Sequence, residues 1–206
     1  MAYHQFTMPQ VLADFGLTLT NRMLFENVKP VPPSAGLRAQ WKDYSSLALT
    51  VSTESARSHF MIAPLLGEVW RMGRGQLALY SGSRFDVDAE AGLVGTCDFI
   101  LGYPPQLDFV VAPVMVIVEA KNENVMGGLG QCAAAMVAAQ RFNAKKNPQI
   151  DTIYGAVSNG GEWKFLRLHG TLLEFDLTDF LHGDPDRILG ILLHITGIAP
   201  AAPLAA

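Results

Sequence analysis

The sequence predicts a mixed α/β fold in which helices cover a central sheet. The apolar run at 114–118 is typical of a strand that is buried on both faces. Longer segments at 54–72 and 129–145 repeat their apolar residues with the period of an amphipathic helix. Helix, strands, helix and further strands follow one another along the chain, which is the order expected of a mixed sheet with helices on its faces.

The elements can be placed in order along the chain. The predicted elements are a strand at 44–51, a helix at 54–72, strands at 77–80, near Phe85, at 93–101 and from 114, a Gly-rich bend at 122–130 followed by a helix to about 145, strands at 152–158, 162–168 and 171–177, and a helix at 184–197. Ser52-Thr53 offers a cap for the first helix, which Pro64 should interrupt or kink. Asn159-Gly160-Gly161 predicts a hairpin turn, and Asp184-Pro185 starts the last helix with a cap and an N1 proline.

Composition bounds the class of protein. The chain has 206 residues, of which 50% are hydrophobic, and this is enough for one well-filled core. No apolar run is long enough to span a membrane, and the first residues lack the pattern of a signal peptide, so we expect a cytoplasmic protein without membrane contact. Cys97 and Cys132 lie in apolar patterns and are expected to be buried free thiols. The formal charge of −4 argues against a non-specific polyanion binder but allows an acidic site that needs a metal.

The end of the strand that starts at Val114 carries the most informative residues. Five apolar residues lead directly into Glu119-Ala120-Lys121. Strand side chains alternate, so Glu119 and Lys121 leave on the same side of the sheet. A core strand that ends with an acid and an amine side by side predicts a functional site.

A second carboxylate lies on the preceding strand. If the strand with Asp98 pairs with the strand with Glu119, both acids meet at one edge of the sheet. Hard oxygen ligands gathered in this way predict a site for Mg²⁺ or Mn²⁺. Lys121 beside the metal could orient or activate water and stabilise the charge of a phosphate. These groups together predict metal-assisted hydrolysis of phosphodiesters.

The sequence resembles the PD-(D/E)XK nuclease superfamily. The resemblance is carried by Asp98 and by Glu119-Ala120-Lys121, with one helix before and one after them. The resemblance implies a restriction-endonuclease-like mixed central sheet flanked by helices over 52–198, with an added C-terminal β-meander and helix. An N-terminal extension at 1–51 would pack on this core, and 199–206 would form an Ala/Pro tail. The resemblance also implies that Asp98, Glu119 and the Ala120 carbonyl bind the metal and that Lys121 assists the nucleophile.

The resemblance extends to residues on the two helices. Several members use an acid near the start of the first helix, where Glu54 fits and Glu68 competes; Glu54 is favoured because it opens the helix. Gln131 matches a glutamine found on the helix after the lysine strand, although Ala135 replaces the tyrosine that follows in one subgroup. The proline that names the superfamily is also absent before Asp98.

Other patterns have simpler interpretations. Gly128-Leu-Gly130-Gln-Cys-Ala133 fits a dinucleotide-binding turn, but it lies far from the end of its strand and no acid follows to hold a ribose. His59 and the other histidines show no ligand spacing and are expected at surface or core positions. The last helix is apolar on nearly all sides, which predicts burial or a homodimer interface.

The sequence as a whole predicts a divalent-metal-dependent nuclease that acts on nucleic acid, with DNA as the expected substrate. Catalysis is assigned to Asp98, Glu119, Lys121, Gln131 and Glu54, and the metal ligands are Asp98, Glu119, Ala120 and Glu54. The alternative is a non-catalytic binding or interaction module with the same fold, which could form a homodimer.

Overall fold

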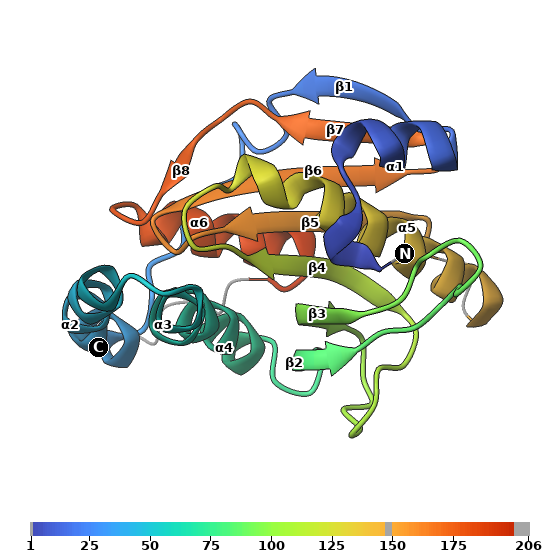
Figure 1. Cartoon of the computed structure of the whole chain (residues 1–206). Coiled ribbons are helices and arrows are strands. Elements are labelled where there is room, and N and C mark those ends of the chain that lie inside the picture. Colours follow the sequence, from blue (N-terminus) through green and yellow to red (C-terminus); the bar gives the residue numbers. More distant parts are fainter. Residues whose placement is uncertain (1, 147–149, 200–206) are drawn as a thin grey trace.

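The chain folds as a mixed α/β structure on one central sheet (Figure 1). The computed structural model describes residues 2–146 and 150–199. The strands are β1 (Thr18–Arg22), β2 (Ala78–Arg84), β3 (Thr96–Gly102), β4 (Val114–Ala120), β5 (Thr152–Ser158), β6 (Glu162–His169), β7 (Leu172–Asp176) and β8 (Phe180–Leu181). They lie in the order β1-β7-β6-β5-β4-β3-β2, and β8 pairs with β6. β4 pairs with β5 and β1 with β7 in parallel, whereas the other pairs are antiparallel.

Helices cover both faces of this sheet, as predicted. The helical segments are η1 (Tyr3–Gln5), α1 (Met8–Phe15), α2 (Ala35–Val51), α3 (Glu54–Arg57), η2 (Ser58–Ile62), α4 (Ala63–Met72), η3 (Met126–Gly128), α5 (Leu129–Lys146) and α6 (Pro185–Ile195). α5 lies on one face with α1 packed against it, and α4 and α6 cover the other face. Because both faces are buried, every residue of β4 is buried.

The strand predicted at 44–51 is wrong, because these residues belong to helix α2. Ser34 caps this helix by accepting a hydrogen bond from the Leu37 N–H, at 3.3 Å. Leu37, Ser45 and Ala48 are buried along one side with helical spacing. The residues that gave the segment its β-like composition, including Leu47 and Val51, are exposed on the other side. The buried stripe, and not the local composition, decides the conformation.

The helix predicted at 54–72 is present, and its interruption takes the form of a π-helical turn. Thr53 caps α3 by accepting a hydrogen bond from the Ala56 N–H. The turn η2 follows, in which the Ala63 N–H bonds to the carbonyl of Ser58, five residues earlier. Pro64 has no N–H to offer and would crowd a regular helix, so the wider turn just before it relieves that conflict.

The first residues of the chain are held tightly against α5. Gly130, near the start of that helix, packs against the backbone that leads into α1. A Cβ atom at Gly130 would lie only 2.7 Å from the Met8 nitrogen and 2.6 Å from the Thr7 carbonyl carbon. The glycine therefore allows the two backbones to approach each other, and no side chain fits between them.

Replacing Gly130 with alanine should lower the free energy of unfolding by about 1–3 kcal/mol, because the new methyl group meets backbone atoms that cannot turn aside. The matched control is Gly67→Ala in α4, where a Cβ would have no atom within 4 Å. That change should stabilise the fold by up to about 1 kcal/mol, through helix propensity. Urea unfolding of both variants measures the difference, and a Gly130→Ala protein as stable as Gly67→Ala would contradict this packing.

The C-terminal half agrees closely with the sequence. β5, β6 and β7 form the predicted meander, and Asp184 caps α6 by accepting a hydrogen bond from the Arg187 N–H. α6 is buried against the core of this same chain, which accounts for its apolar surface. Cys97 and Cys132 are free and buried, as expected. Of the predicted tail, 200–206 lie outside the described residues.

Within the described part of the chain, none of the helices is both long enough and apolar enough to cross a membrane.

Candidate active site

The two acidic residues that were predicted to meet, Asp98 and Glu119, lie together near the ends of the paired strands β3 and β4. In the antiparallel pair of β3 and β4, Phe99 lies opposite Val118, so Asp98 and Glu119 occupy the next position along. Their carboxyl groups are within hydrogen-bonding reach of each other. The Ala120 N–H donates to Oδ2 of Asp98 at 2.7 Å, which holds this carboxylate against the end of β4.

Glu119 is fully buried, and only one of its two carboxylate oxygens has a partner. Nε2 of Gln131, on α5, donates to Oε2 of Glu119 at 2.6 Å. Oε1 is buried without a hydrogen-bond partner. Burial raises the pKa of Glu119 well above its usual value, and the nearby Asp98 carboxylate raises it further. The site therefore disfavours a second negative charge beside Asp98 and leaves one oxygen of the Glu119 carboxyl group without a partner.

Lys121 supplies the nearest positive charge. Its backbone N–H donates to the Ser158 carbonyl at 2.8 Å, and its ammonium group opposes the rise in the pKa of Glu119. The stem of its side chain passes over Gly128, where a Cβ would lie 2.9 Å from Cε of Lys121 and 2.7 Å from Val157. The glycine-rich bend thus leaves space for the lysine to reach the site.

The structure separates the two acids that competed for a role on the first helix. Glu68 is buried and receives two hydrogen bonds from Arg71, at 3.0 and 2.9 Å, and one from the backbone N–H of Ser34. The hydrogen bonds from Arg71 lower the pKa of Glu68, so this carboxylate joins α4 to the start of α2. Glu54 is exposed, and its charge contributes to raising the pKa of Glu119. Glu54 is therefore the helix acid that faces the site.

A cavity of about 340 Å³ opens beside Asp98, and the buried Glu119 is not among the residues that line it. Asp98, Ala120 and Glu54 line it, together with Ser55, Ser58, His59, Ala63, Ser81, Gly82 and Phe99. Its size suits a group about as large as one nucleotide. His59 and the serines were not predicted from the sequence as site residues. The available signal was that Glu54, Ser55, Ser58 and His59 share one side of a helix.

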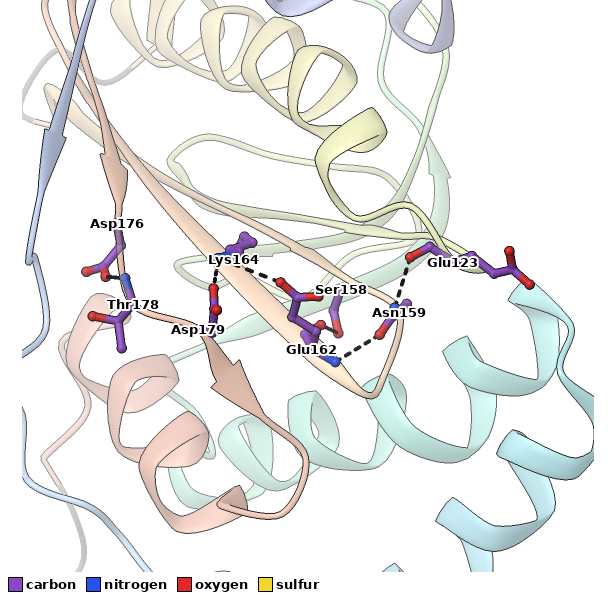
Figure 2. Close-up of polar contacts among 8 residues, drawn as sticks. All are labelled: Glu123, Ser158, Asn159, Glu162, Lys164, Asp176, Thr178 and Asp179. Carbon is purple, nitrogen blue, oxygen red and sulfur yellow. Dashed lines mark hydrogen bonds and ion pairs between the residues drawn. The ribbon is translucent and has the colours of Figure 1, made fainter.

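The hairpin between β5 and β6 is bonded to the loop that follows β4 (Figure 2). Nδ2 of Asn159 donates to the Glu123 carbonyl at 3.1 Å, in the loop after Lys121, and Oδ1 of Asn159 accepts from the Glu162 N–H. Nη1 of Arg57, at the end of α3, donates to the Asn159 carbonyl at 3.0 Å. One turn therefore connects the helix that carries Glu54 with the loop that follows Lys121.

The same hairpin contains a buried lysine whose charge is compensated within the protein (Figure 2). Lys164 forms an ion pair with Asp179 and lies 3.6 Å from a carboxylate oxygen of Glu162. Its ammonium group also lies over the Phe175 ring, 5.7 Å from the centroid. These contacts hold the segment before β8 against β6, so Lys164 is a structural residue.

The donor set fits a magnesium ion that keeps part of its water shell. Across residues 2–146 and 150–199, no three His, Cys, Asp or Glu side chains form a group that could hold a metal ion. The available oxygens are those of Asp98 and Glu119 and the Ala120 carbonyl. Mg²⁺ is commonly bound through one or two carboxylates and several waters, and the unpartnered Oε1 of Glu119 offers such a ligand. Glu54 lies outside this pair, at a place where it can act through a water.

The glycines of the dinucleotide-like motif have structural roles. The space beside Gly128 is filled by Lys121 and Val157, and that beside Gly130 by the backbone from Phe6 to Met8. A pyrophosphate would need both glycines free, so this motif does not form a nucleotide-binding turn here.

No protein-family model matches this chain, and no curated protein matches it either. Function is therefore inferred from the geometry of the site. That geometry brings Asp98, Glu119 and Gln131 into contact, places Lys121 beside them, and puts Glu54 on the cavity wall.

Proposed function

We propose that the protein is a divalent-metal-dependent nuclease with a restriction-endonuclease-like fold. The observation that carries the proposal is the buried, unpartnered Oε1 of Glu119 beside the Asp98 carboxylate, at the ends of two paired core strands. Such an arrangement costs stability unless a cation compensates it. Lys121, two residues after Glu119, and a nucleotide-sized cavity lined by Asp98 and Glu54 support phosphodiester hydrolysis over simple metal storage.

Asp98, Glu119 and the Ala120 carbonyl would hold Mg²⁺ or Mn²⁺. The bound ion would lower the pKa of a coordinated water and neutralise charge on the phosphate. Lys121 orients the attacking water and stabilises the negative charge that develops on the phosphate oxygens. Gln131 keeps the Glu119 side chain in place through its hydrogen bond to Oε2. Glu54 accepts a hydrogen bond from the attacking water across the cavity.

DNA is the proposed substrate, and it would be held mainly at the cavity. The chain has 15 Lys and Arg residues against 19 Asp and Glu residues, so a broad electrostatic attraction is not expected. Arg57 and Lys164 are engaged in contacts within the protein. Binding therefore depends on the metal, on Lys121 and on the hydroxyl groups of the cavity wall.

Calorimetry with Mn²⁺ and Mg²⁺ should show saturable binding to the wild type that is lost in Asp98→Ala. The control is Asp108→Ala, which removes an exposed acid from the loop at the other end of β3. The same three proteins are tested for nicking of plasmid DNA with Mn²⁺ and with EDTA. Wild-type activity that persists in EDTA, or equal binding by Asp98→Ala, would contradict the proposal.

A non-catalytic module with the same fold is the second candidate, and the acidic balance of the chain favours it. This candidate predicts that neither metal binding nor cleavage occurs in the wild type. The calorimetric and nicking experiments therefore distinguish the two functions directly.

A further inference from the structure

His59 lies on the wall of the same cavity as Asp98 and Ala120, and its ring is held in one orientation. Nδ1 lies 2.7 Å from the carbonyl oxygen of Ser55, one helical turn earlier, and 3.3 Å from Oγ of Ser55. A carbonyl only accepts hydrogen bonds, so Nδ1 carries a proton and donates it to Ser55. This contact leaves Nε2 as the nitrogen that is free to meet a ligand.

The chemistry of the cavity wall singles out this histidine. The other polar side chains that line the cavity are the carboxylates of Glu54 and Asp98 and the hydroxyls of Ser55, Ser58 and Ser81. The proposed function already uses Asp98 to bind the metal and Glu54 to accept a hydrogen bond from the attacking water, and a serine hydroxyl is a very weak acid. Imidazole is the side chain that most often transfers protons in general acid–base catalysis.

We propose that His59 is the general acid that protonates the leaving oxygen in phosphodiester cleavage, an inference that rests on the proposed nuclease function. The oxygen of the attacking water forms a bond to phosphorus, and its proton passes to Glu54. The bond from phosphorus to the leaving sugar oxygen breaks, and the bonding electrons stay on that oxygen. Nε2 of His59 gives its proton to this oxygen, and exchange with solvent then restores both side chains.

The π-helical turn contributes to the placement of this group. His59 lies within η2, directly after α3, whose first residue is Glu54. Both residues line the cavity, with Ser55 and Ser58 on the same wall. The helix therefore presents a proton acceptor and a proton donor to one ligand, which is the arrangement that acid–base catalysis needs.

The test compares two leaving groups. Cleavage of a DNA oligonucleotide releases a sugar oxygen as an alkoxide, which needs a proton. Cleavage of thymidine 5′-(p-nitrophenyl phosphate) releases p-nitrophenolate, which is a stable anion and needs no proton. His59→Gln should lower kcat on the oligonucleotide with Mn²⁺ by about 10²-fold or more and change kcat on the nitrophenyl ester by less than about threefold. KM should change little on either substrate. The control is His4→Gln, an exposed histidine in η1, which should behave as wild type on both.

Each other outcome overturns an identified claim. Equal losses of kcat on both substrates would make His59 a phosphate-positioning residue and refute proton donation. Unchanged kcat on the oligonucleotide would remove His59 from catalysis while leaving the nuclease function intact. A wild-type protein that cleaves neither substrate would refute the nuclease function and, with it, the role of His59.

Discussion

Replacing Lys121 with methionine should reduce Mg²⁺-dependent DNA cleavage by about 10²–10⁴-fold and leave folding almost unchanged. Methionine keeps an apolar stem to pass over Gly128 but removes the ammonium group. The loss acts in two ways: the attacking water is no longer oriented, and Glu119 loses the positive charge that helps to keep it ionised. Initial rates on a labelled oligonucleotide, together with urea unfolding, measure both effects.

Lys145→Met provides the control for charge. It removes one exposed lysine from the opposite end of α5, fourteen residues or about 21 Å along the helix from Gln131. Its activity should equal that of the wild type. If both variants lose activity equally, the overall charge of the protein, and not a local role of Lys121, explains the effect. If Lys121→Met cleaves DNA at the wild-type rate, Lys121 has no part in the mechanism.

Glu119→Gln should abolish activity and yet stabilise the metal-free protein at neutral pH, by about 1 kcal/mol or more. The neutral amide can donate to Asp98, where the carboxylate only repels it, and its oxygen can still accept the hydrogen bond from Gln131. Replacing Glu90, which is exposed, with glutamine should change stability by less than about 0.5 kcal/mol. Thermal unfolding in EDTA, at several pH values, measures the gain.

The gain should depend on pH in a defined direction. The folded protein raises the pKa of Glu119, so the penalty of its charge is absent below the ordinary pKa of a glutamate and grows as the pH rises through the folded value. The stability difference between Glu119→Gln and the wild type should therefore disappear at low pH. A stability difference that stays constant with pH, or a Glu119→Gln protein that is less stable than the wild type at neutral pH, would contradict this. Either result would show that the charged Glu119 carboxylate does not destabilise the fold.

The sequence was sufficient to place the residues at the strand ends. β4 is buried on both faces, so the only polar residues near its end stand out against an apolar run, and the alternation of strand side chains gives their direction. Asp98 and Glu119 meet because their strands follow one another in the chain and form an antiparallel pair. Caps are equally local, which is why Thr53 and Asp184 could be identified correctly.

Contacts between residues far apart in the chain could not be predicted from the sequence. Thr18–Arg22 forms β1 only because it pairs with β7, about 150 residues later, and no local pattern indicates that partner. Leu47 and Val51 suggested a strand, but tertiary burial of the opposite side made a helix. His59 shares one side of its helix with Glu54 and the serines, but the cavity exists only because this helix lies beside residues of β3 and β4.

The hairpin turn at Asn159 constrains how this site can change over evolutionary time. The turn forms hydrogen bonds both to α3 and to the loop that follows Lys121. A substitution that shifts the turn would therefore move the helix that carries Glu54 together with the end of β4. The positions of the two halves of the site therefore depend on one turn. Changes in substrate preference would arise more easily at Ser58 or Ser81, which line the cavity outside this connection.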